Sequence, residues 1–163
     1  MNIFEYAMQM ETDGRKFYLD HVAKAPQPEL KKILTELADD ELKHYNLFKA
    51  LHDGHKAEYK EESQTTILVT VKNVFEQLRS SDKTYAFAPD AKKIWEQARE
   101  VEHKSEVFYR EQASIVDRPD QKKILNKIAD EEHKHWVTLQ NVIEFLDRPT
   151  QWLENAEWNS TED

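Results

Sequence analysis

The chain contains an internal repeat, and this repeat constrains its fold more than any other feature. Residues 4–52 align without a gap on residues 95–143. The match includes "ADDELKHY" at residues 38–45 and "ADEEHKHW" at residues 129–136. Each copy also has a proline-containing break near its middle, at "KAPQP" and at "VDRPD". Because proline is tolerated at the start of a helix and not inside one, each copy is predicted to be a helical hairpin.

The two predicted hairpins span residues 2–52 and residues 90–146. We expect their helices at residues 2–24, 29–52, 90–115 and 120–146. Residues 53–89 are too long for a tight turn and are interpreted as a crossover along the bundle. This crossover is expected to contain a short helix near residues 66–79, although its "TILVTV" stretch has strand propensity.

The composition favours long helices in one domain. The 163 residues include only 2 Gly and 5 Pro, and 34% are charged, which does not suit a turn-rich sheet protein. The predicted fold class is therefore all-α, with a four-helix bundle over residues 1–148. Residues 149–163 form a predicted C-terminal tail, whose two tryptophans are expected to pack on the bundle or on a partner chain.

Charge and hydropathy exclude several classes of partner. The net charge of -9 argues against binding to nucleic acid or to an anionic membrane, because both are polyanions. No apolar run is long enough to span a membrane, and the first residues lack a signal-peptide pattern, so we expect a cytoplasmic protein. The absence of cysteine excludes disulfides and cysteine-ligated iron within these residues.

Six polar side chains occupy positions where helical spacing predicts a buried core. In the second predicted helix, a Glu and a His three residues apart interrupt a stripe of leucines, one isoleucine and one phenylalanine. The last helix repeats this arrangement, and the first and third helices each place one Glu in line with apolar residues. The six residues are Glu11, Glu41, His44, Glu102, Glu132 and His135.

Four ionised carboxylates in a protein core require positive charge, because each unpaired buried charge costs several kcal/mol. The neighbouring Lys43 and Lys134 lie off the apolar stripe, and no arginine lies on it. Two divalent cations would balance the four carboxylates while both imidazoles stay neutral. The pattern therefore predicts a centre that holds two metal ions.

Four segments, "METDGRKFY", "DDELKHYNLF", "VEHKSEVFY" and "DEEHKHW", resemble the rubrerythrin-like branch of the ferritin-like superfamily. The resemblance implies a ferritin-like four-helix bundle with two iron ions, although carboxylates and imidazoles also suit Mn and Zn. Glu41 and Glu132 are the implied bridges between the metals. The implied ligands are Glu11, Glu41, His44, Glu102, Glu132 and His135.

The chain departs from classical rubrerythrins at two points. Those proteins carry an extra Glu one turn after the ligand of the third helix, where this chain has Ser105. The symmetric position on the first helix is Gly14, and we expect these two small residues to leave room for O2 or peroxide; close helix packing at Gly14 is the alternative. Classical rubrerythrins also carry a cysteine-ligated rubredoxin module, so this chain is expected to use an external electron donor, rubredoxin-like or other.

Four further residues are candidates for contacts that position the ligands. Tyr18 and Tyr109 follow their Glu by seven residues and are predicted to hydrogen-bond carboxylates; core tyrosines without a role are the alternative. Asp40 and Glu131 precede the histidines by four residues. We expect them to accept an imidazole N–H on the same or the facing helix, the alternative being a solvated helix face.

The resemblance implies a di-iron oxidoreductase that reduces hydrogen peroxide or O2, with a role in oxidative stress. One alternative is a ferroxidase or storage-type protein that binds iron, Mn or Zn without peroxidase turnover. Another is a di-iron oxygenase of an organic substrate, which would need a pocket that opens onto the metals. A homodimer is expected, because the apolar crossover and the tryptophan-bearing tail offer surfaces beyond the needs of one bundle.

Overall fold

The computed structural model describes residues 2–25, 27–81 and 83–155. These residues form helices and connecting segments, with no strand among them, so the predicted all-α class is confirmed. A short 3-10 helix, η1, spans Glu61–Ser63. The α-helices are α1 (Ile3–Val22), α2 (Pro28–His52), α3 (Ile67–Ser80), α4 (Lys93–Ile115), α5 (Pro119–Asp147) and α6 (Pro149–Glu154).

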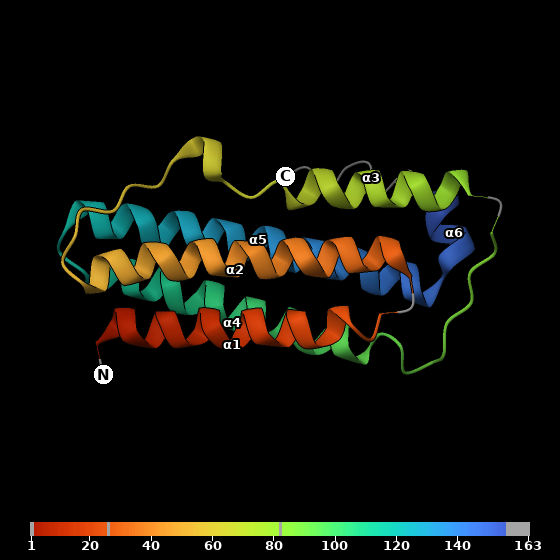
Figure 1. The fold of residues 1–163 in the computed structure, drawn as a ribbon, viewed down its shortest axis with the longest axis horizontal. Coiled ribbons are helices and arrows are strands. Elements are labelled where there is room, and N and C mark those ends of the chain that lie inside the picture. Colours follow the sequence, from red (N-terminus) through yellow and green to blue (C-terminus); the bar gives the residue numbers. More distant parts are fainter. Residues whose placement is uncertain (1, 26, 82, 156–163) are drawn as a thin grey trace.

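The four long helices form an elongated bundle of two hairpins (Figure 1). Helix α1 packs mainly on α2, and α4 packs mainly on α5. The two hairpins meet through α2 with α5 and through α1 with α4. The segment after α2 runs back along the outside of the bundle to α3, and a second loop then leads to the start of α4.

Local sequence signals explain where several helices begin and end. The Asn2 side chain accepts a hydrogen bond from the Phe4 backbone N–H at the start of α1 (2.6 Å), which satisfies one of the free donors of the first turn. Pro28 and Pro119 begin α2 and α5, where a missing N–H has no cost. Gly54 follows α2 with a φ of 76°, a left-handed conformation that glycine adopts without steric penalty.

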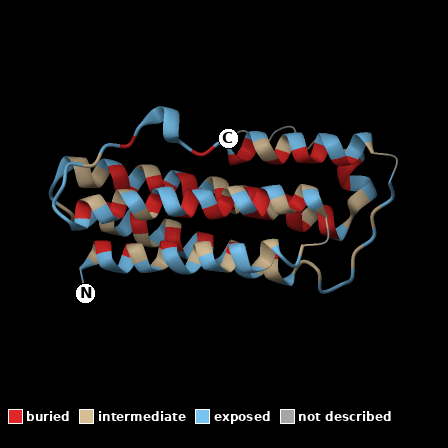
Figure 2. Ribbon diagram, in the orientation of Figure 1, coloured by how far each residue is buried: buried red, intermediate tan, exposed pale blue. Residues whose placement is uncertain are grey.

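Helix α3 shows how packing overrides local propensity. Its β-branched residues favour strands in isolation, but Ile67, Val71 and Val74 recur at helical spacing and are fully or almost fully buried. Helix α3 lies against both α2 and α5, and its buried side faces the bundle (Figure 2). The helix therefore covers the seam between the two hairpins while its polar residues face solvent.

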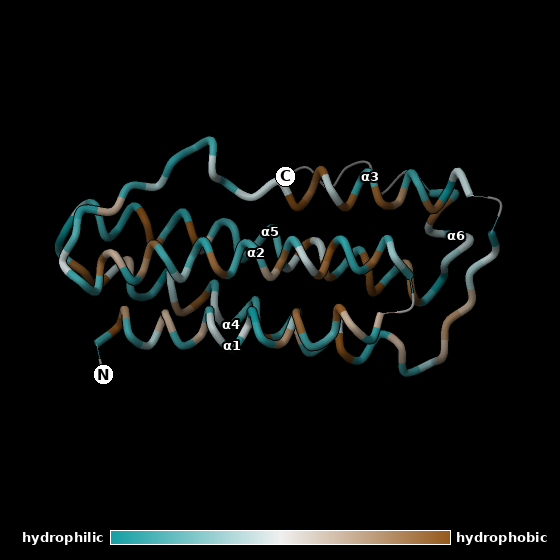
Figure 3. The backbone as a smooth tube through the Cα atoms, in the orientation of Figure 1, coloured by the Kyte–Doolittle hydropathy of each residue, from teal (hydrophilic) through white to brown (hydrophobic). Residues whose placement is uncertain are grey.

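The interior consists of two apolar clusters, one toward each end of the bundle. Figure 3 shows hydrophilic and hydrophobic residues alternating within the turns of the long helices. One cluster includes Leu37 and Leu139 together with residues of α3 and α6. The other includes Phe48 and Ile128. Along α2 and α5, the Glu and His residues singled out from the sequence lie between these two clusters.

The tail returns to the bundle through α6. Trp152 is 1% exposed and makes an edge contact with Phe75 of α3, with ring centroids 5.7 Å apart. The second tryptophan of the tail, Trp158, lies outside the described residues. None of the described helices is long and apolar enough to cross a membrane.

The burial of Trp152 predicts a large effect on stability. Trp152→Ala should lower the free energy of unfolding by about 3–5 kcal/mol, because it leaves a cavity between α3 and α6. The matched control is Val69→Ala, since Val69 lies on the outer face of α3 and is 54% exposed. Urea unfolding followed by circular dichroism measures both, and equal effects of the two variants would contradict this packing.

Candidate metal centre

The structure brings the six residues singled out from the sequence together at mid-bundle. Glu11 comes from α1 and Glu102 from α4. Helices α2 and α5 each supply a Glu and a His three residues apart, which places both side chains on one face, one turn apart. All six side chains are buried: Glu11, Glu41, His44, Glu102, Glu132 and His135.

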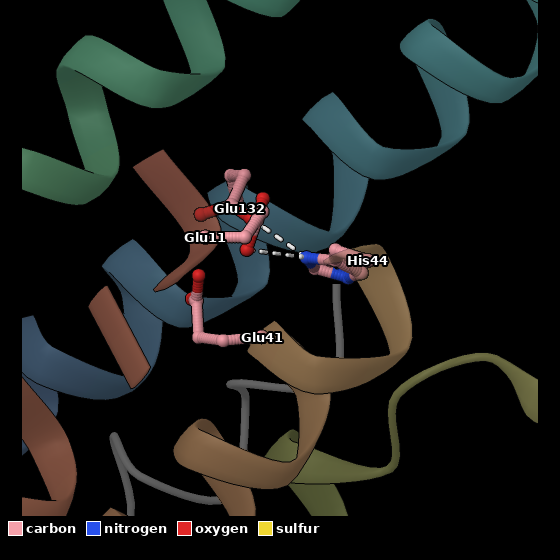
Figure 4. Close-up of side chains that lie close together, drawn as sticks. All are labelled: Glu11, Glu41, His44 and Glu132. Carbon is pink, nitrogen blue, oxygen red and sulfur yellow. Dashed lines mark ion pairs between the residues drawn. The ribbon is translucent and has the colours of Figure 1, made fainter. Parts of the chain in front are cut away.

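The six residues form two overlapping groups that share Glu41 and Glu132. Within each group, one ligand-type atom per residue lies within 4.8 Å of all the others. The first group adds Glu11 and His44, and Figure 4 shows its carboxylates and the imidazole turned toward one another. The second group adds Glu102 and His135. Because Glu41 and Glu132 belong to both groups, the arrangement suits two metal ions that share these carboxylates, as in the ligand set of di-iron and di-manganese bundles.

His44 presents its two ring nitrogens to different partners. Its Nδ1 faces the centre, 2.9 Å from Glu132 Oε1 and 3.4 Å from Glu11 Oε2. Its Nε2 points outward and lies 2.8 Å from Glu131 Oε1. A proton on Nε2 is donated to this carboxylate, so Nδ1 is the nitrogen that a metal ion would bind, displacing any proton it carries.

His135 repeats this arrangement from the opposite side. Its Nδ1 lies 3.4 Å from oxygens of both Glu41 and Glu102, and its Nε2 lies 2.9 Å from Asp40 Oδ2. The rings of His44 and His135 are stacked with centroids 5.9 Å apart. In both cases the outer carboxylate comes from the facing helix. The sequence had left open whether Asp40 and Glu131 contact the histidine of their own helix or that of the facing helix.

Each candidate tyrosine contacts a carboxylate of the opposite hairpin that belongs to one group only. The Tyr109 hydroxyl donates to Glu11 Oε1 (2.8 Å), and the Tyr18 hydroxyl donates to Glu102 Oε1. The other oxygen of each of these carboxylates, Oε2, is buried without a hydrogen-bond partner. Each tyrosine therefore fixes one carboxylate oxygen and leaves the second oxygen available to bind a metal ion.

Two residues of the crossover contact Glu131 and Asp40, the outer partners of the histidines, and sequence reasoning missed both. The Tyr59 hydroxyl donates to Glu131 Oε2, which also accepts from the Thr65 backbone N–H (3.0 Å). The Thr65 hydroxyl donates to Asp40 Oδ2. Both residues belong to the segment outside the repeat, so no symmetric counterpart marked them.

The electrostatics of the centre are those of a cluster that needs a cation. Burial, reinforced by the other carboxylates, raises the pKa values of Glu11, Glu41 and Glu132. Burial also acts on Glu102, but the adjacent His135 and hydrogen bonds to its carboxylate outweigh it and lower its pKa to about 2. Within the described part of the chain, no lysine or arginine pairs with these four carboxylates.

Buried acceptor atoms without a hydrogen-bond partner indicate whether the centre suits metal ions. Five buried atoms have no hydrogen-bond partner although they face one another at the centre: Glu11 Oε2, Glu41 Oε1, His44 Nδ1, Glu102 Oε2 and Glu132 Oε1. Unmade hydrogen bonds of this kind are rare in protein interiors. Carboxylate oxygens and imidazole nitrogens suit Fe, Mn and Zn, so this donor set fits a pair of divalent cations.

Gly14 has a specific role beside the centre. A Cβ atom at this position would lie 3.0 Å from Glu41 Oε2 and 3.3 Å from Glu41 Cδ. Glycine therefore allows the shared Glu41 carboxylate to approach α1. This close approach accounts for a glycine inside a helix, although glycine lowers helix stability. Gly14 and Ser105 also line a common cavity of about 410 Å³, so the space expected beside these small residues is present.

Comparison with known proteins identifies a family and a fold. The family model described as Rubrerythrin matches residues 2–143. A solved structure of a hypothetical protein from Pyrococcus furiosus has a TM-score of 0.65 at 21% identity, and the match covers 88% of this chain and 87% of that chain. This likeness shows the shared fold alone. The chain matches no curated protein.

The pKa shifts predict an unusual pH dependence for the metal-free protein. The folded state holds protons on its raised carboxylates, and also on His44 and His135, where burial opposes the charge but neighbouring carboxylates raise the pKa. Unfolding releases these protons, so stability should fall as the pH rises above the ordinary Glu pKa of 4.5, and more steeply above the ordinary His pKa of 6.5, by about 1.4 kcal/mol per pH unit for each proton released. Below the ordinary Glu pKa of 4.5, the lowered pKa of Glu102 reverses the trend.

Divalent metal should abolish this fall, because metal replaces the protons and its affinity increases with pH. Urea unfolding at several pH values, with and without Fe(II) under anaerobic conditions, measures both effects. The cation requirement would be contradicted if the metal-free protein became more stable from pH about 6 to about 8.

The outer carboxylates should control metal affinity without binding metal themselves. Asp40→Ala should weaken binding at the position next to His135 by about 10–100-fold, because the imidazole loses the partner that fixes its proton and orientation. Asp39→Ala is the matched control, since Asp39 is the adjacent, exposed residue of α2. Competitive metal titration measures both, and equal affinities would exclude a positioning role for Asp40.

Proposed function

We propose that this chain, which belongs to the rubrerythrin family, binds two iron ions and reduces hydrogen peroxide or O2 with electrons from an external donor. One observation carries the proposal: two groups of buried acceptor atoms share Glu41 and Glu132. Several of these atoms lack any hydrogen-bond donor. Such a cluster must be neutralised by protons or by metal ions, and two irons at neighbouring positions suit two-electron chemistry.

The proposed ligands divide into terminal and shared groups. Glu11 and His44 would hold one iron, and Glu102 and His135 the other. Glu41 and Glu132 would contact both ions, since each belongs to both groups. When bound, the two irons supply two electrons to the oxidant and later receive two from the donor.

The surrounding residues hold the ligands in place. Tyr18 and Tyr109 keep their protons, because burial and nearby carboxylates raise their pKa values well above the ordinary range. They therefore remain hydrogen-bond donors to Glu102 and Glu11 throughout. Glu131 stays ionised, because its hydrogen bonds from His44 and Tyr59 outweigh the effect of burial and lower its pKa to about 2. Apolar clusters lie on either side of the centre along the bundle.

The metal stoichiometry should reveal which carboxylates are shared. Wild-type protein loaded anaerobically should bind two Fe(II) per chain. Glu102→Ala removes a ligand of one group only and should retain one tightly bound iron, whereas Glu41→Ala should lose both. Glu100→Ala is the control, because Glu100 is 65% exposed on the same helix as Glu102. Equal loss of iron in the Glu102 and Glu41 variants would contradict the division.

The reaction is tested by stopped-flow mixing of the Fe(II)-loaded protein with hydrogen peroxide or O2. The proposal predicts rapid oxidation of both irons and the same rate after re-reduction over several cycles. Slow oxidation that occurs once, with release or retention of iron, would instead assign the chain to iron binding or storage.

A further inference from the structure

A cavity of about 410 Å³ lies between α1 and α4 and reaches the centre. Its inner end is formed by Tyr18, Glu41 and Glu102, and Glu102 Oε2 is one of the buried atoms without a hydrogen-bond partner. Tyr6 and Val101 also line the cavity and are about half exposed, so it opens to solvent. The cavity therefore connects the surface with two of the proposed metal ligands.

Small residues on the two facing helices create this space. Gly14 lies on α1, and Ala98 and Ser105 lie on α4, one turn on either side of Glu102. A longer side chain at position 105 would extend into the cavity next to Glu102. Met10, Phe17 and Val101 form apolar walls, and the charged Asp13 and Lys104 also line the cavity.

The volume is much larger than hydrogen peroxide or O2 needs. A water molecule occupies about 30 Å³ in the liquid, and either oxidant is close to that size. Cavities of roughly 300–1,000 Å³ with apolar walls and a few polar groups are typical of sites for organic molecules. Of its polar groups, Glu41, Glu102 and Tyr18 are buried at the end nearest the centre, whereas the charged Asp13 and Lys104 are exposed.

A second cavity on the other side of α1 also reaches the centre. It touches Glu11 and Glu41 and has a volume of about 390 Å³; Arg15, Lys16 and Asp20 line it together with Leu19 and Leu42. The centre thus has two approaches, and a small oxidant has a route that does not pass Ser105.

We propose that the cavity between α1 and α4 binds the apolar part of an organic hydroperoxide and directs its peroxide group to the centre. This inference rests on the proposed function and names its substrate class. The reaction breaks the O–O bond of ROOH. With two irons bound, the centre would supply the two electrons for this cleavage, and two protons from solvent complete the products ROH and water. An external electron donor would return the two electrons to the centre.

Binding is tested first on the metal-free protein, so that the readout does not depend on activity. Cumyl alcohol, the unreactive product of cumene hydroperoxide, should bind saturably and shift the NMR methyl signals of Ala98 and Val101. Ser105→Leu should weaken this binding by about tenfold or more, because the added side chain occupies part of an apolar site. Ser114→Leu is the control, since Ser114 is an exposed residue of the same helix.

Kinetics then separate this inference from the proposed function. With the Fe(II)-loaded protein, Ser105→Leu should slow oxidation by cumene hydroperoxide about tenfold more than oxidation by hydrogen peroxide, because the small oxidant also has a route through the cavity beside Glu11. Metal content and circular dichroism of each variant verify that the site is intact. Ala98→Leu provides a second variant with the same expectation, in case Ser105→Leu does not fold.

Three outcomes would overturn the inference. Absence of cumyl alcohol binding, with normal oxidation by hydrogen peroxide, would exclude the cavity as a substrate site and leave the proposed function intact. Equal slowing of both peroxides in both cavity variants would show that the substitutions act on the metals. Alcohol binding with no oxidation by either peroxide would overturn the proposed function, and hydroperoxide reduction with it.

Discussion

The structure depends on the burial of four carboxylates at the middle of a helical bundle without a lysine or arginine to pair with them in the described residues. A bundle with this core is stable only if protons or metal ions neutralise the carboxylates. The apolar clusters on either side hold the four helices in place, so the carboxylates cannot move apart to reach water. Rigid helices thus keep the repulsion in place, and bound metal ions would relieve it.

The internal repeat gives the centre an approximate twofold symmetry, which the crossover breaks. His44 is held by Glu131 and His135 by Asp40, each from the facing helix. However, Glu131 also accepts from Tyr59, whereas Asp40 accepts from the Thr65 hydroxyl. The two histidines therefore have different outer partners. Two metal ions bound here would occupy inequivalent positions, although the sequence of their nearest ligands is repeated.

Most of the helical core and the six central residues could be predicted because helical spacing and the repeat are visible in one sequence. Tyr59 and Thr65 could not, because their contacts depend on the path of an irregular segment with no repeat counterpart. The contacts of Asp40 and Glu131 were predicted only as one of two alternatives, since spacing alone does not say which helix faces them. The extent of the cavity beside Gly14 and Ser105 depends on how α1 packs on α4, which no local pattern specifies.

The most direct test is the position of metal in crystals of Fe(II)-loaded protein, measured by anomalous diffraction at the iron edge. The account predicts two iron peaks per chain. One lies next to His44 Nδ1 and Glu11, and the other lies next to His135 Nδ1 and Glu102, with Glu41 and Glu132 reaching both. A single peak, or none in a bundle with unchanged helices, would contradict the claim that two cations neutralise the buried carboxylates.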